Sequence, residues 1–296
     1  MPIVDHGRVL AATSEVIEAH RRAGRPFDVD GIGSFTLDQG SGPAVVLLHG
    51  VPSSSFLYRK VVPLVAAEDL RAVAFDFPGL GLSDRPEEYD YTWSGLARFT
   101  GEAIDALEIE RCHLVVHDIG GPIGFEWAIR NPERVASLTA LNTLVDVATF
   151  HRPWSMHPFS IRGLGEVWLR SLNPWMMRQL FYLQTIADRS ATPPAEIYAY
   201  YHLLKRDDGG RAFLRIMRGF ELSAEKERFY RDGLGALECP RQVVWGDRDP
   251  ALKHERRIAV QEFLDVSDPI LLPAKHFLQE DQAPAVAGAV AALAKR

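Results

Sequence analysis

The sequence predicts an α/β protein, with a mostly parallel sheet flanked by helices and one helical insertion after the sixth strand. Between Phe27 and about Thr143, short β-branched runs alternate with segments whose apolar residues recur about every 3.6 positions. The strand pattern then vanishes over a stretch rich in aromatic, Met and Arg residues and broken by prolines, and afterwards returns. We therefore expect a core domain of residues 1–143 and 233–296, with residues 144–232 as a separate helical domain.

The individual elements follow from this alternation. The stretch FDVDGIGSFTLDQGSG resembles a hairpin, and the next two strands are apolar on both faces, as in a parallel sheet. The loops after parallel strands gather at one edge of the sheet, where ligands bind. The predicted strands after the hairpin are AVVLLHG, AVAFDF, HLVVHD, SLTALNT, QVVWG and PILLP, and the predicted helices are FLYRKVVPLVAAE, WSGLARFTGEAIDAL, PIGFEWAIRN and the terminal EDQAPAVAGAVAALAKR.

The composition limits the partners and the compartment. The chain has 296 residues, a net charge of −6 and a pI near 5.9, without a long basic block, which argues against nucleic acid and anionic membranes. Its cysteines lie far apart, the N-terminus lacks a secretory pattern, and no apolar run reaches the roughly 20 residues of a membrane span. We expect a soluble cytoplasmic protein, monomeric or homodimeric. No metal or other cofactor is expected, because metal-ligand spacings and a phosphate-binding glycine loop are missing from the sequence.

The most informative stretch is HLVVHDIGGPIGFEWA, in which Asp118 stands between a strand and a helix. Such an elbow lifts its central side chain above the sheet, and Gly120 and Gly121 allow the helix to approach closely. The helix N-terminus stabilises a carboxylate at this point. The sequence alone leaves two interpretations open, because Asp is also a preferred helix N-cap.

Three further features follow predicted strands on the same edge. In HGVPSS, the backbone N–H of Val51 is free to form an oxyanion hole with that of Ile119, although the loop also fits an ordinary strand-to-helix turn. An acid follows the next-to-last strand, and His276 follows the last one. The order of Asp118, an acid and then a histidine matches a nucleophile with its base and orienting group. The other histidines near these strands, His49, His113 and His117, are expected to be structural.

Six segments carry a resemblance to a known family. They are HGVPSSSFLYRKVVP, FDFPGLGLSDRP, VVHDIGG, NPERV, GDRDP and HFLQED, in this order and spacing. The sequence resembles α/β-hydrolases of the haloalkane dehalogenase and epoxide hydrolase branch over about residues 30–290. The resemblance implies that the insertion is a helical cap domain, whose underside forms the substrate pocket.

The resemblance also assigns a catalytic triad. It implies that Asp118 is the nucleophile, His276 the base and Asp249 the acid, because Gly246 sets the register of the family pattern Gly-x-x-Asp. Asp247 is the weaker candidate for the acid. Some dehalogenases carry the acid after the preceding strand, and that position here is the neutral Asn142. A carboxylate nucleophile attacks saturated carbon without prior deprotonation, and His276 then activates the water that hydrolyses the resulting ester.

The leaving-group residues of both subfamilies are incomplete. Dehalogenases use side-chain N–H donors where this chain has Ile119 and Val51, which leaves the cap residue Trp168 as a candidate halide donor. Epoxide hydrolases use two cap tyrosines; Tyr182 lies near the first position, and Met217 occupies the second. Both candidates also fit ordinary packing roles in the cap. Haloacid dehalogenases carry arginines next to the nucleophile, and this chain lacks them.

Three functions therefore stay open. The first is a dehalogenase-like hydrolase that acts on a small apolar organic substrate with water. The second is an epoxide hydrolase with a cap tyrosine as acid, and the third is a non-catalytic, ligand-sensing protein that keeps the triad by descent. Apolar cap residues predict an apolar pocket, although some must form the core of the cap itself. These residues are Phe150, Phe159, Trp168, Met176, Met177 and Phe181.

Overall fold

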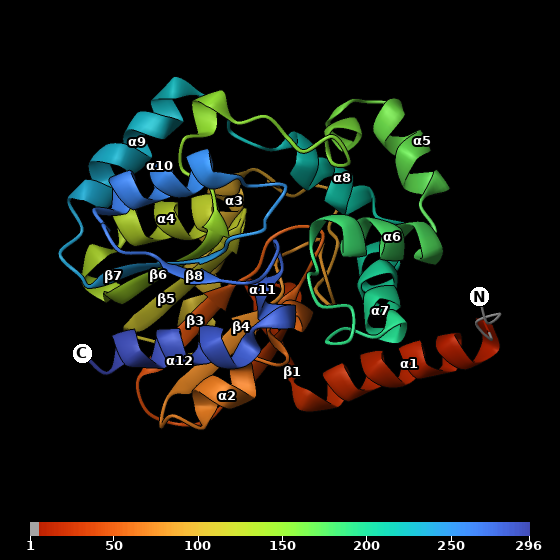
Figure 1. Cartoon of the computed structure of the whole chain (residues 1–296), viewed down its shortest axis with the longest axis horizontal. Coiled ribbons are helices and arrows are strands. Elements are labelled where there is room, and N and C mark those ends of the chain that lie inside the picture. Colours follow the sequence, from red (N-terminus) through yellow and green to blue (C-terminus); the bar gives the residue numbers. More distant parts are fainter. Residues whose placement is uncertain (1–5) are drawn as a thin grey trace.

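An eight-stranded sheet with the order β1-β2-β4-β3-β5-β6-β7-β8 forms the centre of the protein, which a computed structural model describes over residues 6–296 (Figure 1). The first two strands form an antiparallel hairpin, β2 pairs antiparallel with β4, and every later pairing is parallel. The strands are β1 Arg25–Val29, β2 Ile32–Gln39, β3 Ala44–Leu48, β4 Arg71–Phe75, β5 Cys112–Asp118, β6 Val135–Thr143, β7 Arg241–Gly246 and β8 Ile270–Leu272. The predicted α/β fold class and all of the predicted strands are confirmed.

Alternation along the buried strands builds two apolar layers. In β3, Val46 and Leu48 belong to one core cluster, whereas Val45 and Leu47 belong to the other, on the opposite face of the sheet. Figure 1 shows α3, α4, α9 and α10 on the first face and α2 and α12 on the second. These helices are α2 Val62–Ala66, α3 Trp93–Ala106, α4 Gly120–Arg130, α9 Ala224–Gly235, α10 His254–Leu264 and α12 Ala283–Ala294.

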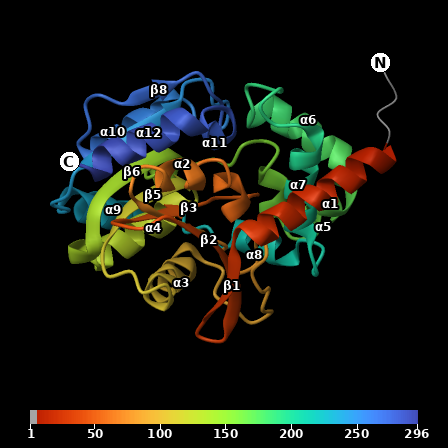
Figure 2. The same cartoon turned by 90° about the horizontal axis from the view of Figure 1, so that it is seen from below.

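Two elements differ from the sequence-based expectation. The helix expected over FLYRKVVPLVAAE is split into a 3-10 turn, Ser55–Tyr58, and the short α2, which has Pro63 in its first turn. The sequence analysis also placed no element before Phe27, yet helix α1 spans His6–Ala23 and packs along α7 of the insertion (Figure 2). No helix within residues 6–296 combines the length and the apolarity that crossing a membrane requires.

The insertion between β6 and β7 is entirely helical. It contains α5 Leu164–Ser171, α6 Pro174–Gln184, α7 Pro194–Lys205 and α8 Arg211–Arg218, which lie together beside the sheet in Figure 1. The next helix, α9, contains the expected boundary at residue 232 and packs against α4 and α10 of the core. We propose that the cap comprises α5 to α8, and that α9 belongs with the core; the 144–232 boundary is a prediction.

A buried ion cluster joins the cap to the core. The Glu280 side chain, in α11 Leu278–Asp281, is fully buried and accepts hydrogen bonds from Arg59 at 2.5 and 2.9 Å, Lys60 at 2.7 Å and the Tyr200 hydroxyl at 2.5 Å. Arg59 also pairs with Glu196 of α7. Burial opposes ionisation of Glu280, but the two cations outweigh it and lower the pKa of Glu280 to about 2.

Replacing Glu280 tests this cluster. Glu280→Gln keeps the shape but removes the fully buried carboxylate, so that Arg59 and Lys60 share only the more exposed Glu196. We therefore expect it to lower the free energy of unfolding by about 3 kcal/mol. Because the pKa of Glu280 is lower in the folded than in the unfolded state, its contribution is complete above the unfolded pKa and is lost as pH falls toward about 2. The variant should therefore lose part of the acid sensitivity of the wild type. Urea unfolding at a series of pH values measures both effects.

The control is Glu68→Gln, since Glu68 pairs with Lys295 on the surface and both side chains are 49% exposed. This variant should change the free energy of unfolding by less than about 1 kcal/mol. Equal effects of the two substitutions would contradict the role given to the buried cluster.

Candidate active site

Asp118 lies at a sharp elbow between β5 and α4. Its backbone has a φ of +53°, in the left-handed region that non-glycine residues seldom adopt. The hydroxyl of Thr143 at the end of β6 donates to the Asp118 carbonyl at 2.6 Å. A Cβ on Gly121 would lie 1.7 Å from that same hydroxyl oxygen, so the residue at this position must be glycine. The N-cap of α4 is Ile119, which leaves the Asp118 carboxylate directed into the site rather than used as a helix cap.

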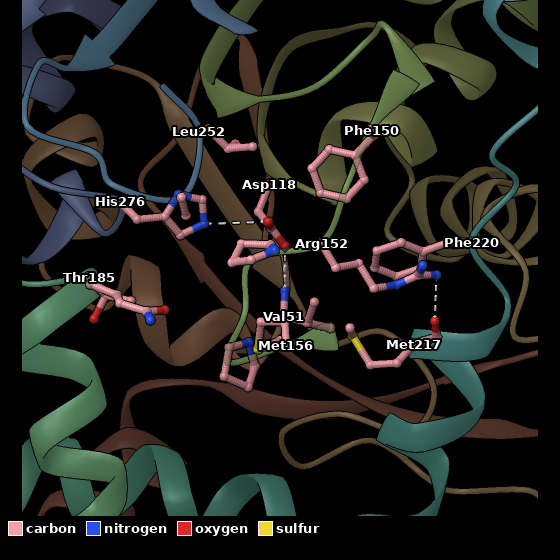
Figure 3. Close-up of a pocket in the computed structure, with 14 residues that line it drawn as sticks. Val51, Asp118, Phe150, Arg152, Met156, Thr185, Met217, Phe220, Leu252 and His276 are labelled. Atoms are coloured by element: carbon pink, nitrogen blue, oxygen red, sulfur yellow. Dashed lines mark hydrogen bonds and ion pairs between the residues drawn. The ribbon is translucent and has the colours of Figure 1, made fainter. Parts of the chain in front are cut away.

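The imidazole of His276 lies between the carboxylates of Asp118 and Asp249, at the ends of β5, β7 and β8. His276, in the loop after β8, places Nε2 3.4 Å from Asp118 Oδ2 and Nδ1 2.8 Å from Asp249 Oδ2 (Figure 3 for the Asp118 contact). The other oxygen of Asp249 accepts backbone hydrogen bonds from Ala251 at 2.7 Å and Leu252 at 3.0 Å. Asp249 thus faces His276 in a fixed orientation, whereas Asp247 is exposed and does not reach the imidazole.

The two carboxylates set the charge state of the imidazole. Burial disfavours the cation, but Asp249 and Asp118 outweigh burial and raise the pKa of His276 to about 10. Burial likewise opposes ionisation of Asp118, whereas His276 and the Val51 N–H favour it, so that the pKa of Asp118 is lowered. At neutral pH the site therefore holds a protonated His276 beside an ionised Asp118.

The loop after β3 lies against the same carboxylate. The Val51 N–H donates to Asp118 Oδ1 at 2.8 Å, as Figure 3 shows. A Cβ on Gly50 would lie 2.2 Å from that oxygen, so this close approach of the backbone requires glycine. Ile119, the expected second donor, is buried at the start of α4, directly after Asp118.

The neighbouring histidines are neutral and hold the backbone. His49 accepts from the Phe77 N–H at 3.2 Å and donates from Nδ1 to the Gly50 carbonyl at 2.9 Å, while burial lowers the pKa of His49 to about 4. His117 contacts the His276 carbonyl through Nε2 at 2.9 Å, and burial lowers the pKa of His117 to about 3. Both side chains position the loops that carry the site.

The Asp118 carboxylate and the His276 imidazole face a mostly apolar cavity between the sheet edge and the insertion (Figure 3). A second cavity lies among α5 to α8 and shares four lining residues with the first. The shared residues are Pro52, Met156, Gln184 and Thr185. Of the apolar cap residues expected in a pocket, Phe150 lines the first cavity, and Phe159, Met177 and Phe181 line the second.

The expected leaving-group residues do not reach the cavity. The Trp168 N–H donates to the Ser155 carbonyl at 3.2 Å, and the Tyr182 hydroxyl donates to the Thr192 carbonyl at 3.3 Å. Asn142 instead supports the acid: its Nδ2 donates to Asp249 Oδ2 at 2.7 Å. Trp168 and Tyr182 were placed by analogy of sequence position, but their polar atoms satisfy the backbone of the insertion.

Sequence reasoning missed the polar residues that do line the cavity, namely Arg152, Gln184 and Thr185. Arg152 stands in the loop HRPW, and Gln184 and Thr185 stand at the end of α6. The only signal in the sequence was a cation within a stretch otherwise rich in aromatic residues and proline. Among residues 6–296, no group of three or more His, Cys, Asp or Glu side chains is arranged so that it could hold a metal ion.

Comparisons with known proteins agree with the fold. The family model of the alpha/beta hydrolase fold matches residues 43–283. Haloalkane dehalogenase 2 of Mycobacterium tuberculosis is 29% identical over 266 residues, which cover 86% of this chain and 88% of that protein. Cfl2 from Burkholderia cenocepacia has a similar structure, with a TM-score of 0.76 at 25% identity over 90% of this chain and 94% of that chain. The epoxide hydrolase CorEH shares the fold, with a TM-score of 0.76 at 20% identity over 91% and 97% of the two chains.

The resemblance seen in the sequence motifs is thereby confirmed. The matched family and the relatives named haloalkane dehalogenase identify an enzyme, a hydrolase of this superfamily. The chain belongs to the α/β hydrolase fold family, and the relatives that it resembles over most of its length include haloalkane dehalogenases.

Proposed function

We propose that the protein is a dehalogenase-like hydrolase that forms a covalent ester on Asp118. An Asp118 oxygen attacks a saturated carbon of the substrate; the new C–O bond forms as the carbon–halogen bond breaks, and the halide leaves with the electron pair. The observation that carries this proposal is the Asp118 carboxylate, ionised and held at a positive φ, at the wall of an apolar cavity. Such a cavity suits a small apolar organic substrate.

The second step is hydrolysis of the ester. The negative charge of Asp118 helps to keep His276 protonated. Esterification removes this charge, so the pKa of His276 falls from about 10. The neutral imidazole then takes a proton from a water that attacks the Asp118 carboxyl carbon. The Val51 N–H, already 2.8 Å from Oδ1, stabilises the negative oxygen of the tetrahedral intermediate together with the Ile119 N–H. Collapse expels an alkoxide, which takes the proton from His276 and leaves as the alcohol. The carboxylic acid formed on Asp118 then gives its proton to His276, which restores the carboxylate and the imidazolium.

In this proposal, Asp249 orients the His276 ring and stabilises its cation. Its carboxylate, fixed by Asn142 and two backbone N–H groups, holds Nδ1 protonated and leaves Nε2 toward the ester. The charge on Asp249 then stabilises the imidazolium that forms when water is deprotonated.

The cavity lining argues against an epoxide hydrolase that uses a tyrosine acid. No tyrosine lines either cavity in the described part of the chain, and the cap tyrosine Tyr200 donates to Glu280 instead. A tyrosine acid for an epoxide oxygen is therefore missing. The side-chain donors at the cavity are Arg152, Gln184 and Thr185, and the Gln184 amide is oriented by the Ser155 hydroxyl, which donates to its oxygen at 2.7 Å.

Substitution of the nucleophile tests the proposal. Asp118→Asn replaces the attacking carboxylate with an amide, and we expect bromide release from a panel of bromoalkanes to fall by at least about a thousandfold. The matched control is Asp247→Asn, which removes a nearby exposed carboxylate outside the cavity and should leave the rate unchanged. A ligand-sensing protein would show no turnover with either form, and retained turnover in Asp118→Asn would overturn the proposed nucleophile.

The two steps should respond differently to pH. The pKa of Asp118 is lowered and that of His276 is raised to about 10, so both keep their charged forms across the neutral range. The first release of bromide, measured by rapid quench, should thus be independent of pH between about 6 and 8. Hydrolysis of the ester requires neutral His276 and should accelerate as pH rises through the lower pKa of the esterified enzyme. A first step that slows in parallel with the second at low pH would contradict this assignment.

A further inference from the structure

Arg152 is a cation in the cavity wall that no step of the proposed reaction uses. Its guanidinium lies over the Phe220 ring, with 4.5 Å between Cζ and the ring centroid, and its Nη2 donates to the Met217 carbonyl at 2.9 Å. The Nε atom is buried and has no hydrogen-bond partner. Arg152 thus holds a fixed position at the cavity with donor capacity left over.

Within residues 6–296, no carboxylate lies within 4.0 Å of Arg152. By contrast, Arg59 pairs with Glu280, Arg85 with Asp208 and Arg256 with Asp146. Arg241 also has no carboxylate partner among these residues, but it donates to four backbone carbonyls, whereas Arg152 donates to one. Burial lowers the pKa of Arg152, and no neighbouring charge opposes that effect. A cation without a counter-ion is costly to bury, which indicates that an anion completes the site when it is occupied.

The carboxylates of the active site do not supply that anion. Asp118 and Asp249 both face His276, on opposite nitrogens of its ring. In Figure 3 the Arg152 guanidinium points toward Phe220 and Met217, on the side of Asp118 away from His276. Arg152 lines the same cavity as Asp118. Because Nη2 donates to Met217 and Nε is buried, Nη1, which donates to no residue among 6–296, is the nitrogen left for a molecule in that cavity.

We propose that Arg152 binds an anionic group of the substrate, with a carboxylate as the simplest case. The inference rests on the proposed function and specifies its substrate: the reacting carbon lies at Asp118, between the anionic group and an apolar chain. A guanidinium matches a carboxylate through paired N–H donors, and stacking on Phe220 keeps its plane fixed. Arg152 is thus a specificity residue that acts on binding and orientation.

The second cavity accepts the apolar chain. It adjoins the first, because Pro52, Met156, Gln184 and Thr185 line both. Its remaining walls are apolar side chains, including Leu172, Leu180 and Phe213, apart from Ser155. In Figure 3, Thr185 lies on the His276 side of Asp118 and Arg152 on the other, which gives an elongated substrate opposite surroundings at its two ends.

Binding of unreactive probes tests the inference without any chemistry at Asp118. Octanoate and octanol share their alkyl chain and differ in charge, and titration calorimetry measures the affinity of each. Arg152→Met should weaken octanoate binding at least about tenfold and leave octanol binding unchanged. Arg152→Lys keeps the charge but loses the planar fork and should give an intermediate octanoate affinity. The control is Arg170→Met, which removes an exposed cation of α5 that lines neither cavity.

Equal loss of octanoate and octanol binding, or no loss in Arg152→Met, would overturn the anion site. Thermal unfolding of the variant shows whether it folds, and the Arg152→Lys variant keeps the test valid if it does not. Because octanoate forms no ester, this result is separate from failure of the proposed reaction, which the Asp118→Asn experiment reports.

Turnover distinguishes recognition from leaving-group stabilisation. With bromooctanoates, Arg152→Met should raise KM at least about tenfold with little change in kcat, while KM for bromooctane stays the same. If the variant instead lowers kcat equally for the acid and the neutral substrate, Arg152 acts on the departing bromide and the proposal is wrong.

Discussion

The site depends on one imidazole held between two carboxylates. His276 contacts Asp118 through one nitrogen and Asp249 through the other, and neither contact would persist without a rigid support. That support continues past the histidine: the next residue, Phe277, donates its N–H to the Thr185 carbonyl at 2.8 Å, and the Asp281 carboxylate accepts from two backbone N–H groups after α6. Glu280 of the same segment holds the cation cluster against α7. The segment that carries the base therefore also fixes the position of the cap.

This coupling gives the cavity its chemical character. The cap covers a sheet edge at which Asp118 and His276 form a charged pair, and the remaining walls are mostly apolar. In such surroundings an ionised carboxylate is stabilised by few groups, chiefly His276 and the Val51 N–H. Removal of its charge on esterification changes the pKa of His276, so in our proposal the first step itself prepares the base for the second. Among residues 6–296, Arg152 is the one cation of the lining outside this pair.

Much of the core could be predicted from the sequence because parallel strands end at a common edge. Asp118, Asp249 and His276 each follow a strand, and knowledge of the strand order suffices to expect them together. The choice of Asp249 over Asp247 followed from the register set by Gly246, and the geometry agrees with that choice. By contrast, α1 was missed although Val9, Ala12, Val16 and Ile17 recur at helical spacing in the sequence. The sequence could not predict where the side chains of Trp168, Tyr182 and Arg152 point, since the direction of a cap side chain depends on how short helices pack.

The most direct test of the account is the intact mass of a His276→Phe variant after exposure to a bromoalkane panel and, separately, an epoxide panel. Without the base, the ester on Asp118 should form and persist. The account predicts a protein heavier by the alkyl group, with one equivalent of bromide released. An adduct with the mass of the whole epoxide and none from bromoalkanes would favour epoxide chemistry. A folded protein that neither panel labels would contradict a nucleophilic Asp118.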